Sequence, residues 1–184
     1  LNLDVNILPS MIYLNSREWR IQPSHMRVNG DGVDVTSVEF LSNGQSIDIS
    51  GRVSKTKQDT LTLNLNRFDI SVINPLLGSD FGLKGAATGS AQLTSPMKTK
   101  GLLADILCDS TYLAGKPLGI VTLASKWDED FERFDINVRN ELNGTSNIEA
   151  TGRLTPKTKS LEATARLNSL DVGYVEPVLK EIFS

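Results

Sequence analysis

The feature that most constrains the fold of this chain is a two-part segment at residues 61–77 that occurs again near the C-terminus. Its first part alternates polar residues with Leu61, Leu63 and Leu65, as a β-strand with one buried face does. Its second part, residues 70–77, has apolar residues at the i, i+3 spacing of a short helix, for which Asp69 or Ser71 is the expected N-cap. The chain is therefore expected to run from a strand into a short helix at least twice.

The repetition extends over two units of about a hundred residues each. Gly51-Arg52-Val53-Ser54 matches Gly152-Arg153-Leu154-Thr155, and Phe68-Asp69-Ile70 matches Leu170-Asp171-Val172. We therefore expect a first β unit at residues 1–78, a Gly-rich hairpin connection at residues 79–104, and a second β unit at residues 105–184 that ends in a short helix. Repeated units of this kind form extended arrays in which neighbours complete each other's core.

Turn signals throughout the chain favour an all-β, antiparallel fold with one or two short helices. Asn43-Gly44 and Asn143-Gly144 each lie between alternating segments, and Asn-Gly suits the type I′ turn of a hairpin. Ser95-Pro96 marks a further hairpin turn. The apolar alternation slips between Val35 and Val38, which predicts a β-bulge.

Composition excludes several classes of protein. A net charge of −3, a pI near 5.2 and 6% aromatic residues argue against a nucleic-acid partner, which requires a basic face and stacking aromatics. Apolar runs are far shorter than the roughly 18 residues that cross a bilayer. Cys108, the only cysteine, is interpreted as a small core residue. Because the sequence begins at Leu1 without a targeting segment, we interpret it as a piece of a longer protein.

Residues that commonly carry chemistry do not form a recognisable motif here. His25 is the only histidine, and no nucleophile accompanies it in a catalytic pattern. The run Asp128-Glu129-Asp130 lacks the glycine and terminal glutamate of a calcium loop, and is interpreted as a solvated turn. The glycines at 82, 85 and 89 are not followed by Gly-Lys-Ser/Thr, so they do not form a phosphate loop. No catalytic residue, cofactor or metal is predicted, and an enzyme is not expected.

The remaining candidate is an apolar surface. The alternating segments place aliphatic residues on one side of each strand, and two interpretations stay open. These residues pack together as a closed sandwich core, or they line an open sheet as a continuous apolar groove that shields acyl chains or an amphipathic strand. The candidate groove residues are Val33, Val35, Ile47, Ile49, Leu61, Leu63, Leu65, Phe134, Ile136, Val138, Ile148, Ala150, Leu161, Ala163, Ala165 and Leu167.

A family resemblance bears on this choice. Residues 67–104 combine a Leu-Asp-aliphatic-like segment, an Asn-Pro-Leu-Leu segment, a Gly-x-x-x-Gly segment, a Ser-Pro turn and a Gly-aliphatic-aliphatic segment. The residues concerned are Phe68-Asp69-Ile70, Asn74-Pro75-Leu76-Leu77, Gly85-Ala86-Ala87-Thr88-Gly89, Ser95-Pro96 and Gly101-Leu102-Leu103. This order resembles the periplasmic region of TamB/AsmA-like envelope proteins, in a version similar to that of Bacteroidetes-type bacteria.

The resemblance implies a large protein that is anchored in the inner membrane and extends into the periplasm as a curved, taco-like half-pipe with an apolar interior. It also implies a role in outer-membrane biogenesis, through lipid transport or through protein translocation and assembly with a TamA-type outer-membrane barrel as partner. Phospholipid or other acyl chains are the implied cargo. The family has no catalytic residues to carry over, and open sheet edges are expected to make this chain self-associate.

A second hypothesis comes from another class of protein. A self-contained β-sandwich adhesion or glycan-binding module would bury the same aliphatic residues between two sheets. Such a module usually presents exposed aromatic side chains, and the available ones are Trp19, Trp127 and Tyr112. Phospholipid that co-purifies with the chain would separate the two hypotheses, because a sealed sandwich core would hold none.

Overall fold

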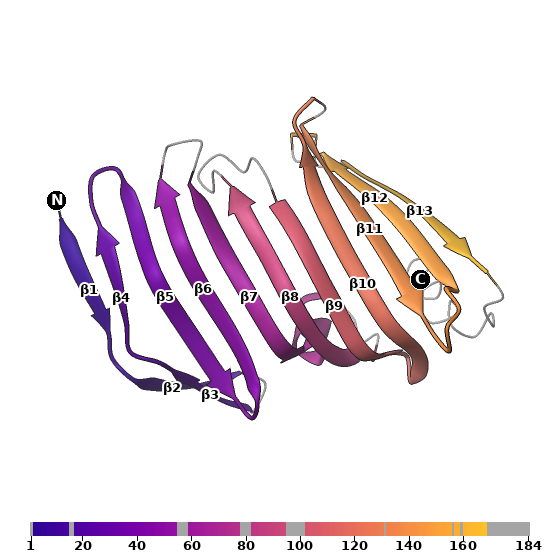
Figure 1. Ribbon diagram of the computed structural model, residues 1–184, viewed down its shortest axis with the longest axis horizontal. Helices are drawn as coiled ribbons and strands as arrows, with labels where there is room; N and C mark the ends of the chain where they lie inside the picture. The colour runs from indigo at the N-terminus through magenta and orange to yellow at the C-terminus, as the bar shows by residue number, and fades with distance from the viewer. Residues whose placement is uncertain are drawn as a thin grey trace.

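A computed structural model describes residues 2–14, 17–54, 59–77, 82–94, 102–130, 132–155, 157–158 and 160–168. These residues form one open, curved antiparallel sheet of 13 strands, with a single 3₁₀ helix, η1, among them (Figure 1). The elements are β1 Leu3–Ile7, β2 Ser10–Leu14, β3 Arg17–Ile21, β4 Ser24–Val28, β5 Gly32–Ser42, β6 Gln45–Ser54, β7 Thr60–Asp69, η1 Ile70–Leu77, β8 Lys84–Thr94, β9 Leu102–Leu113, β10 Lys116–Asp128, β11 Arg133–Glu141, β12 Ile148–Thr155 and β13 Ser160–Leu167. The predicted all-β, elongated and curved antiparallel fold is confirmed.

The strands follow the chain order across the sheet except at the N-terminal end. The main order is β1-β4-β5-β6-β7-β8-β9-β10-β11-β12-β13, and β2 pairs only with β3. β4 pairs with the first part of β5, whereas β3 pairs with Phe40 and Leu41 near its end. Gln22-Pro23 separates β3 from β4, because a proline has no N–H group to donate to the ladder. β5 is long enough to pair along one edge with two short strands, β4 near its start and β3 near its end.

Bulges in several strands produce the curvature of the sheet. The predicted bulge is present, since the pairing of β5 with β6 shifts between Val35 and Val38. Further shifts occur between Leu65 and Phe68 in β7, and near Gly119 in β10. All of the shifts in β7–β10 lie at the lower edge in Figure 1, where the strands curl. A bulge bends its strand and increases the local twist, so these positions curve the sheet around one face.

A run of three strands in the first predicted unit corresponds to a run of three strands in the second. β5–β6–β7 and β11–β12–β13 are both consecutive antiparallel strands. Their first hairpins turn at Asn43-Gly44 (φ 42° and 76°) and Asn143-Gly144 (φ 54° and 74°), so both have the positive φ pair of a type I′ turn. The helix that was expected after residue 170 lies outside the described residues, as does the Ser95-Pro96 turn.

The predicted Gly-rich connection at residues 79–104 contains regular sheet. β8 lies entirely within it, and the first residues of β9 close it. β8 pairs with β7 on one side and with β9 on the other. The sheet therefore continues from the first unit into the second without interruption.

Candidate functional site

Cross-strand pairing places the apolar side chains of all nine strands from β5 to β13 on one side of the sheet. Residues that lie directly opposite each other in an antiparallel pair point to the same face. One row of such partners is Val38, Ile49, Leu63, Ala91, Ala104, Ser125, Ile136, Gly152 and Ala163. The adjacent row is Phe40, Ile47, Leu65, Gly89, Ile106, Leu123, Val138, Ala150 and Ala165. We call the surface to which these two rows belong the apolar face; Ser125 is the one polar residue in the two rows.

All sixteen residues proposed from the sequence lie on this apolar face. Those outside the two rows join it through their own partners: Val33 lies opposite Val53, Leu61 opposite Gly51, and Ile148 opposite Leu167. Phe134 pairs with Leu154, which in turn pairs with Leu161. The strand alternation of the sequence therefore placed these side chains on one surface.

The apolar face is open. Of the sixteen residues, only Phe134 is buried, with 6% of its surface exposed. Those on β5–β7, together with the others on β11 and β12, are half-buried, and the four on β13 are exposed. A sandwich core would bury them between two sheets, whereas the described residues form a single sheet. The alternative of a self-contained β-sandwich is therefore wrong for the described part of the chain.

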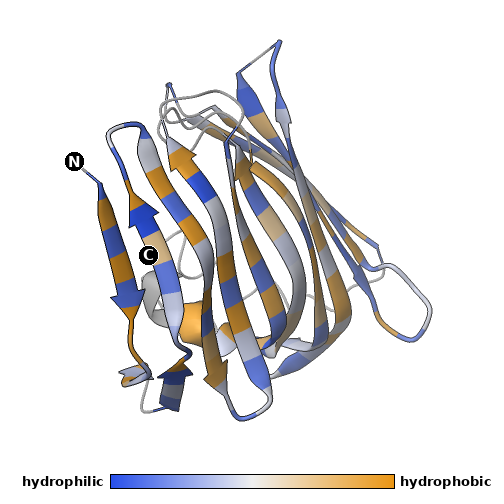
Figure 2. Ribbon diagram, turned by 60° about the vertical axis from the view of Figure 1, so that its left-hand side comes forward, coloured by the Kyte–Doolittle hydropathy of each residue, from blue (hydrophilic) through white to orange (hydrophobic). Residues whose placement is uncertain are grey.

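The opposite face of the sheet is polar. The row of cross-strand partners that lies between the two apolar rows and points to the other side is Glu39, Asp48, Asn64, Ser90, Asp105, Ala124, Asn137, Thr151 and Thr164. Ion pairs between neighbouring strands lie on this side, including Arg52–Asp34 at 2.8 Å. Figure 2 shows the resulting alternation of hydrophobic and hydrophilic residues along the strands. Leu103 and Leu107 are exposed exceptions on the polar face.

The middle of the apolar face is lined by small residues that the sequence reasoning did not include. Ala87, Ala104 and Ser125 on β8, β9 and β10 are 2%, 5% and 6% exposed. They are among the most shielded residues of the apolar face, and we call them its floor. A signal was present in the sequence, because Ala87, Gly89, Ala91 and Leu93 alternate with polar or small residues. Glycine and alanine carry little hydrophobicity, which is why that alternation was interpreted as a connection.

One end of the apolar face is closed by contacts from the β2–β3 hairpin. Trp19 is 1% exposed and its ring centroid lies 6.1 Å from that of Phe68. Ile21 pairs with Phe40 of the apolar rows, so Trp19, two residues earlier on β3, points to the same side. Trp19 and Phe68 are far apart in the sequence, and no local pattern indicated this contact. Trp19 was a candidate for binding glycans, but its burial removes it from that role.

The helix η1 is held beside this end by polar contacts. The Arg17 guanidinium lies 2.8 Å from a carboxylate oxygen of Asp69, and the backbone N–H of Ser71 donates to the other oxygen at 2.9 Å. Asp69 is therefore the N-cap. Burial raises the pKa of Asp69, but the hydrogen bonds from Ser71 and Arg17 outweigh it and hold the pKa below its usual value. Asn74 exchanges two hydrogen bonds with the backbone of Leu83, at 3.0 and 3.2 Å, which joins η1 to the start of β8.

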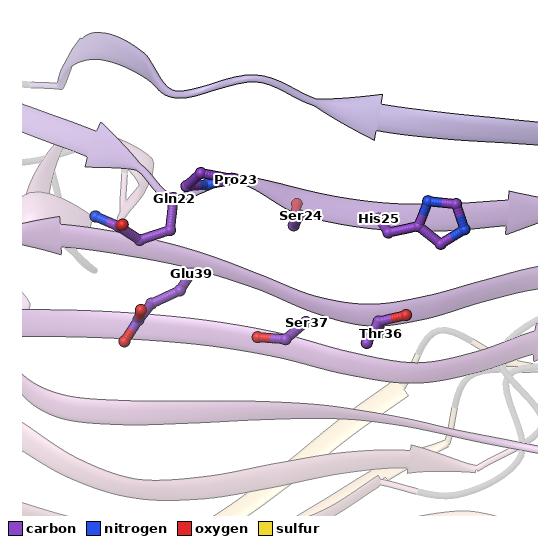
Figure 3. Close-up of a pocket in the computed structure, with 7 residues that line it drawn as sticks. All are labelled: Gln22, Pro23, Ser24, His25, Thr36, Ser37 and Glu39. Atoms are coloured by element: carbon purple, nitrogen blue, oxygen red, sulfur yellow. The ribbon is translucent and has the colours of Figure 1, made fainter.

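A shallow depression of about 430 Å³ lies where the Gln22-Pro23 break meets the bulge of β5 (Figure 3). Polar side chains such as His25, Ser37 and Glu39 line it. The Nδ1 of His25 lies 3.0 Å from Oδ1 of Asn6, and its Nε2 lies 3.3 Å from Oδ1 of Asp4. The hydroxyl of Ser37 donates a hydrogen bond to the carboxylate of Asp48. These contacts join neighbouring strands and leave no nucleophile beside a base. His25 is thus a strand-linking residue on the polar face.

The remaining sequence candidates lie apart from one another. Trp127 packs edge-on against Phe134 at 4.6 Å, and Tyr112 is 41% exposed at the end of β9, so the aromatics form no common platform. Cys108 is half-buried on the apolar face, opposite Ala87 and Val121. Within the described ranges, no three His, Cys, Asp or Glu side chains are grouped to hold a metal, and no helix is long and apolar enough to cross a membrane.

The arrangement as a whole is a continuous, largely aliphatic surface on one face of a curved sheet, closed at one end by Trp19. Its chemistry is limited to the exclusion of water, because its side chains offer almost no donors, acceptors or titratable groups. Comparisons of the chain with protein-family models, with curated proteins and with solved structures found no match. The geometry and the residues therefore carry the functional argument.

Proposed function

We propose that this chain is a segment of a periplasmic apolar β-groove that shields lipid acyl chains and thereby supports outer-membrane biogenesis. The observation that carries the proposal is the pair of apolar rows that crosses β5 to β13 with Ser125 as their one polar residue. Nine strands about 4.8 Å apart give a surface about 38 Å long. The role requires no reacting group, cofactor or metal.

An acyl chain suits this surface better than a nascent β-strand. Each peptide group carries a donor and an acceptor, and a buried one without a partner costs about 1–3 kcal/mol. The apolar face offers a strand almost no partners, because the sheet's own backbone groups are paired within the ladders. A methylene group needs no partner and contributes about 0.8 kcal/mol on removal from water. Of the two cargoes that the family resemblance implies, the lipid therefore meets fewer costs.

The cellular setting comes from the resemblance to TamB/AsmA-like proteins. The residues that carry it, including Phe68, Asp69 and Asn74, lie around η1 at the closed end of the apolar face. In this proposal, the segment is part of a longer inner-membrane-anchored protein whose outer-membrane partner is a TamA-type barrel. A tilted lipid would keep its headgroup in water at the rim while its acyl chains follow the rows of the groove.

Lipid co-purification tests the proposal directly. The chain is produced with a periplasmic leader, and bound phospholipid is measured by native mass spectrometry and by solvent extraction. We expect stoichiometric phospholipid on the unchanged chain. Ile136→Asp should remove most of it, because a carboxylate in one of the apolar rows must stay hydrated.

The matched control is Asn137→Asp, which places the same carboxylate one residue further along β11, on the polar face. It should retain the lipid. Circular dichroism and thermal unfolding check that both variants keep the sheet. A folded, lipid-free unchanged chain, or equal lipid on the two variants, would refute the proposal.

A further inference from the structure

β13 is the last strand of the sheet, and its outer edge has no partner strand among the described residues. All eight of its residues are exposed, from Ser160 to Leu167. Two of them are large and apolar: Leu161 is 65% exposed and Leu167 is 44% exposed. An exposed edge strand offers a row of free backbone N–H and C=O groups to another strand. This edge is therefore one of the open pairing edges in the described structure, together with the outer edges of β1 and β2.

The sequence of β13 is symmetric about its centre. Residues 161–167 are Leu-Glu-Ala-Thr-Ala-Arg-Leu, so apolar, small and polar types recur in the same order from both ends. The one departure from exact repetition is the charge, since Glu162 stands where the mirror position has Arg166. Opposite charges at mirror positions are what an antiparallel pair of identical strands needs, because each position then faces its mirror position in the partner.

The adjacent strand extends this complementarity. Within the chain, Glu162 lies opposite Arg153, and Arg166 lies opposite Glu149. Glu149 in turn approaches Arg139, with 4.0 Å between the carboxylate oxygen and the guanidinium nitrogen. Charges thus alternate in sign along the row from β11 to β13. A second β13 in the mirror register would continue the alternation, with Glu162 of the second copy next to Arg166 of the first.

We propose that two copies of this chain pair through β13 as an antiparallel, two-fold symmetric dimer whose axis passes through Thr164. In this register Leu161 faces Leu167, Glu162 faces Arg166, and Ala163 faces Ala165 of the second copy. Residues opposite each other point to the same side, so the two apolar faces join into one surface of about twice the length. The interface is isologous and closes after two copies. It does not depend on lipid binding.

Pairing of β13 with β1 of a second copy fits less well. Every pair in the main strand order is antiparallel, so β1 and β13 run in the same direction, as their arrows show (Figure 1). Joining them with both apolar faces on one side would make a parallel pair, which is slightly less stable per residue. The polar-face residues of β1 are Asp4 and Asn6, which provide no positive partner for Glu162. Such head-to-tail contacts would also produce open chains of copies.

Charge reversal tests the proposed register. Glu162→Arg and Arg166→Glu are prepared as two separate variants, and their assembly is compared with that of the unchanged chain by native mass spectrometry and sedimentation. Each variant alone places like charges opposite each other twice per dimer. We expect its dimer to be weaker than that of the unchanged chain by about tenfold or more.

An equimolar mixture of the two variants distinguishes a broken interface from a damaged fold. In the mixed dimer, the arginines of one variant face the glutamates of the other, so heterodimers should form in preference to either homodimer. Thermal unfolding of each variant checks that the β12–β13 pairing survives. An unchanged chain that stays monomeric, or a mixture without preferred heterodimers, overturns the proposal.

Disulfide formation locates the axis independently. In a Cys108→Ser background, Thr164→Cys should cross-link two copies under mild oxidation, because the axis sets position 164 opposite itself. Thr151→Cys is the matched control: it lies in the same row but one strand further in, and should not cross-link. Failure of the Thr164→Cys chain to cross-link would show that another segment, such as residues 169–184 or β1 of a second copy, occupies the edge, and would refute the two-fold register.

Discussion

Gly51 and Gly152 hold equivalent positions in the two repeats, yet the structure constrains them differently. Gly51 has a φ of 123°, and a Cβ there would lie 2.1 Å from the backbone oxygen of Thr60. A Cβ on Gly152 would meet nothing closer than 3.7 Å, at the Cβ of Ile136. The close approach of β6 to the start of β7 therefore requires glycine at 51. The same residue at 152 meets no such requirement.

This difference predicts opposite outcomes for one substitution. Gly51→Ala should lower the free energy of unfolding by about 2–4 kcal/mol, because both the positive φ and the backbone contact must be relieved. Gly152→Ala should leave stability within about 1 kcal/mol and can raise it, because alanine reduces the entropy of the unfolded chain. Urea titration of both variants measures the change. Equal losses at the two positions would contradict the prediction.

Among the elements, η1 begins at a carboxylate that also links it to β3, while Asn74 joins it to the start of β8. Asp69 ends β7, caps η1 through Ser71, and pairs with Arg17 of β3. The end of β7, the start of η1 and the distant strand β3 therefore meet at this side chain. A change at Asp69 should loosen the closed end of the apolar face without affecting the distant strands β11–β13.

The ion pair and the cap make the stability of this region depend on pH. The pKa of Asp69 is lower in the folded chain than its usual value of 3.8, so the unfolded state binds the proton first as the pH falls. The stabilisation is complete above the usual value and is lost as the pH falls through the lowered, folded value. Asp69→Ala should therefore cost about 1–2 kcal/mol at neutral pH, and its difference from the unchanged chain should shrink in acid.

Asp69→Asn serves as the control for this prediction, because asparagine caps a helix about as well as aspartate but carries no charge. It should lose only the contribution of Arg17, and its stability should not depend on ionisation at position 69. Chemical denaturation at neutral pH and in acid provides both comparisons. A loss for Asp69→Ala that stays constant into strong acid would contradict the ionic explanation.

At the scale of the whole molecule, the chain keeps an aliphatic surface open that most proteins of this size would cover. Among the described residues, a single curved sheet gives each inner strand two neighbours but gives the apolar face no second layer. Burial is consequently partial across the face, and only its floor and its closed end are shielded. In our proposal, acyl chains complete the burial that the fold leaves unfinished.

Cys108 reports on coverage of the apolar face. Burial raises the pKa of its thiol and thereby lowers the fraction of thiolate, so alkylation should be slower in the folded chain than in urea. Bound phospholipid should slow the reaction further, because Cys108 lies on the face that the acyl chains would cover. The rate of iodoacetamide labelling with and without phospholipid is the measurement. An unchanged rate on saturation with lipid would contradict the proposed location.

Local sequence patterns predicted the strands well but were less informative about their partners. Alternation at Leu61, Leu63 and Leu65 indicated both a strand and its buried side, and the slip at Val35–Val38 indicated a bulge that the structure contains. The helix after Asp69 was expected, although it is 3₁₀. β8 was expected only as part of a Gly-rich hairpin connection, because its inward residues are mostly alanine and glycine. The division of β5 between β3 and β4 left no local pattern at all.

The sequence by itself determined which residues are apolar, how they alternate and where the hairpins turn, since these properties depend on neighbours two to four residues apart. It thereby determined that one face of each strand would be aliphatic. Only the tertiary structure decided that the described strands form one open sheet instead of two packed layers, that Trp19 closes one end, and that the outer edge of β13 has no partner strand among the described residues. Those outcomes depend on how many strands pair and curve together, which no short stretch of sequence specifies.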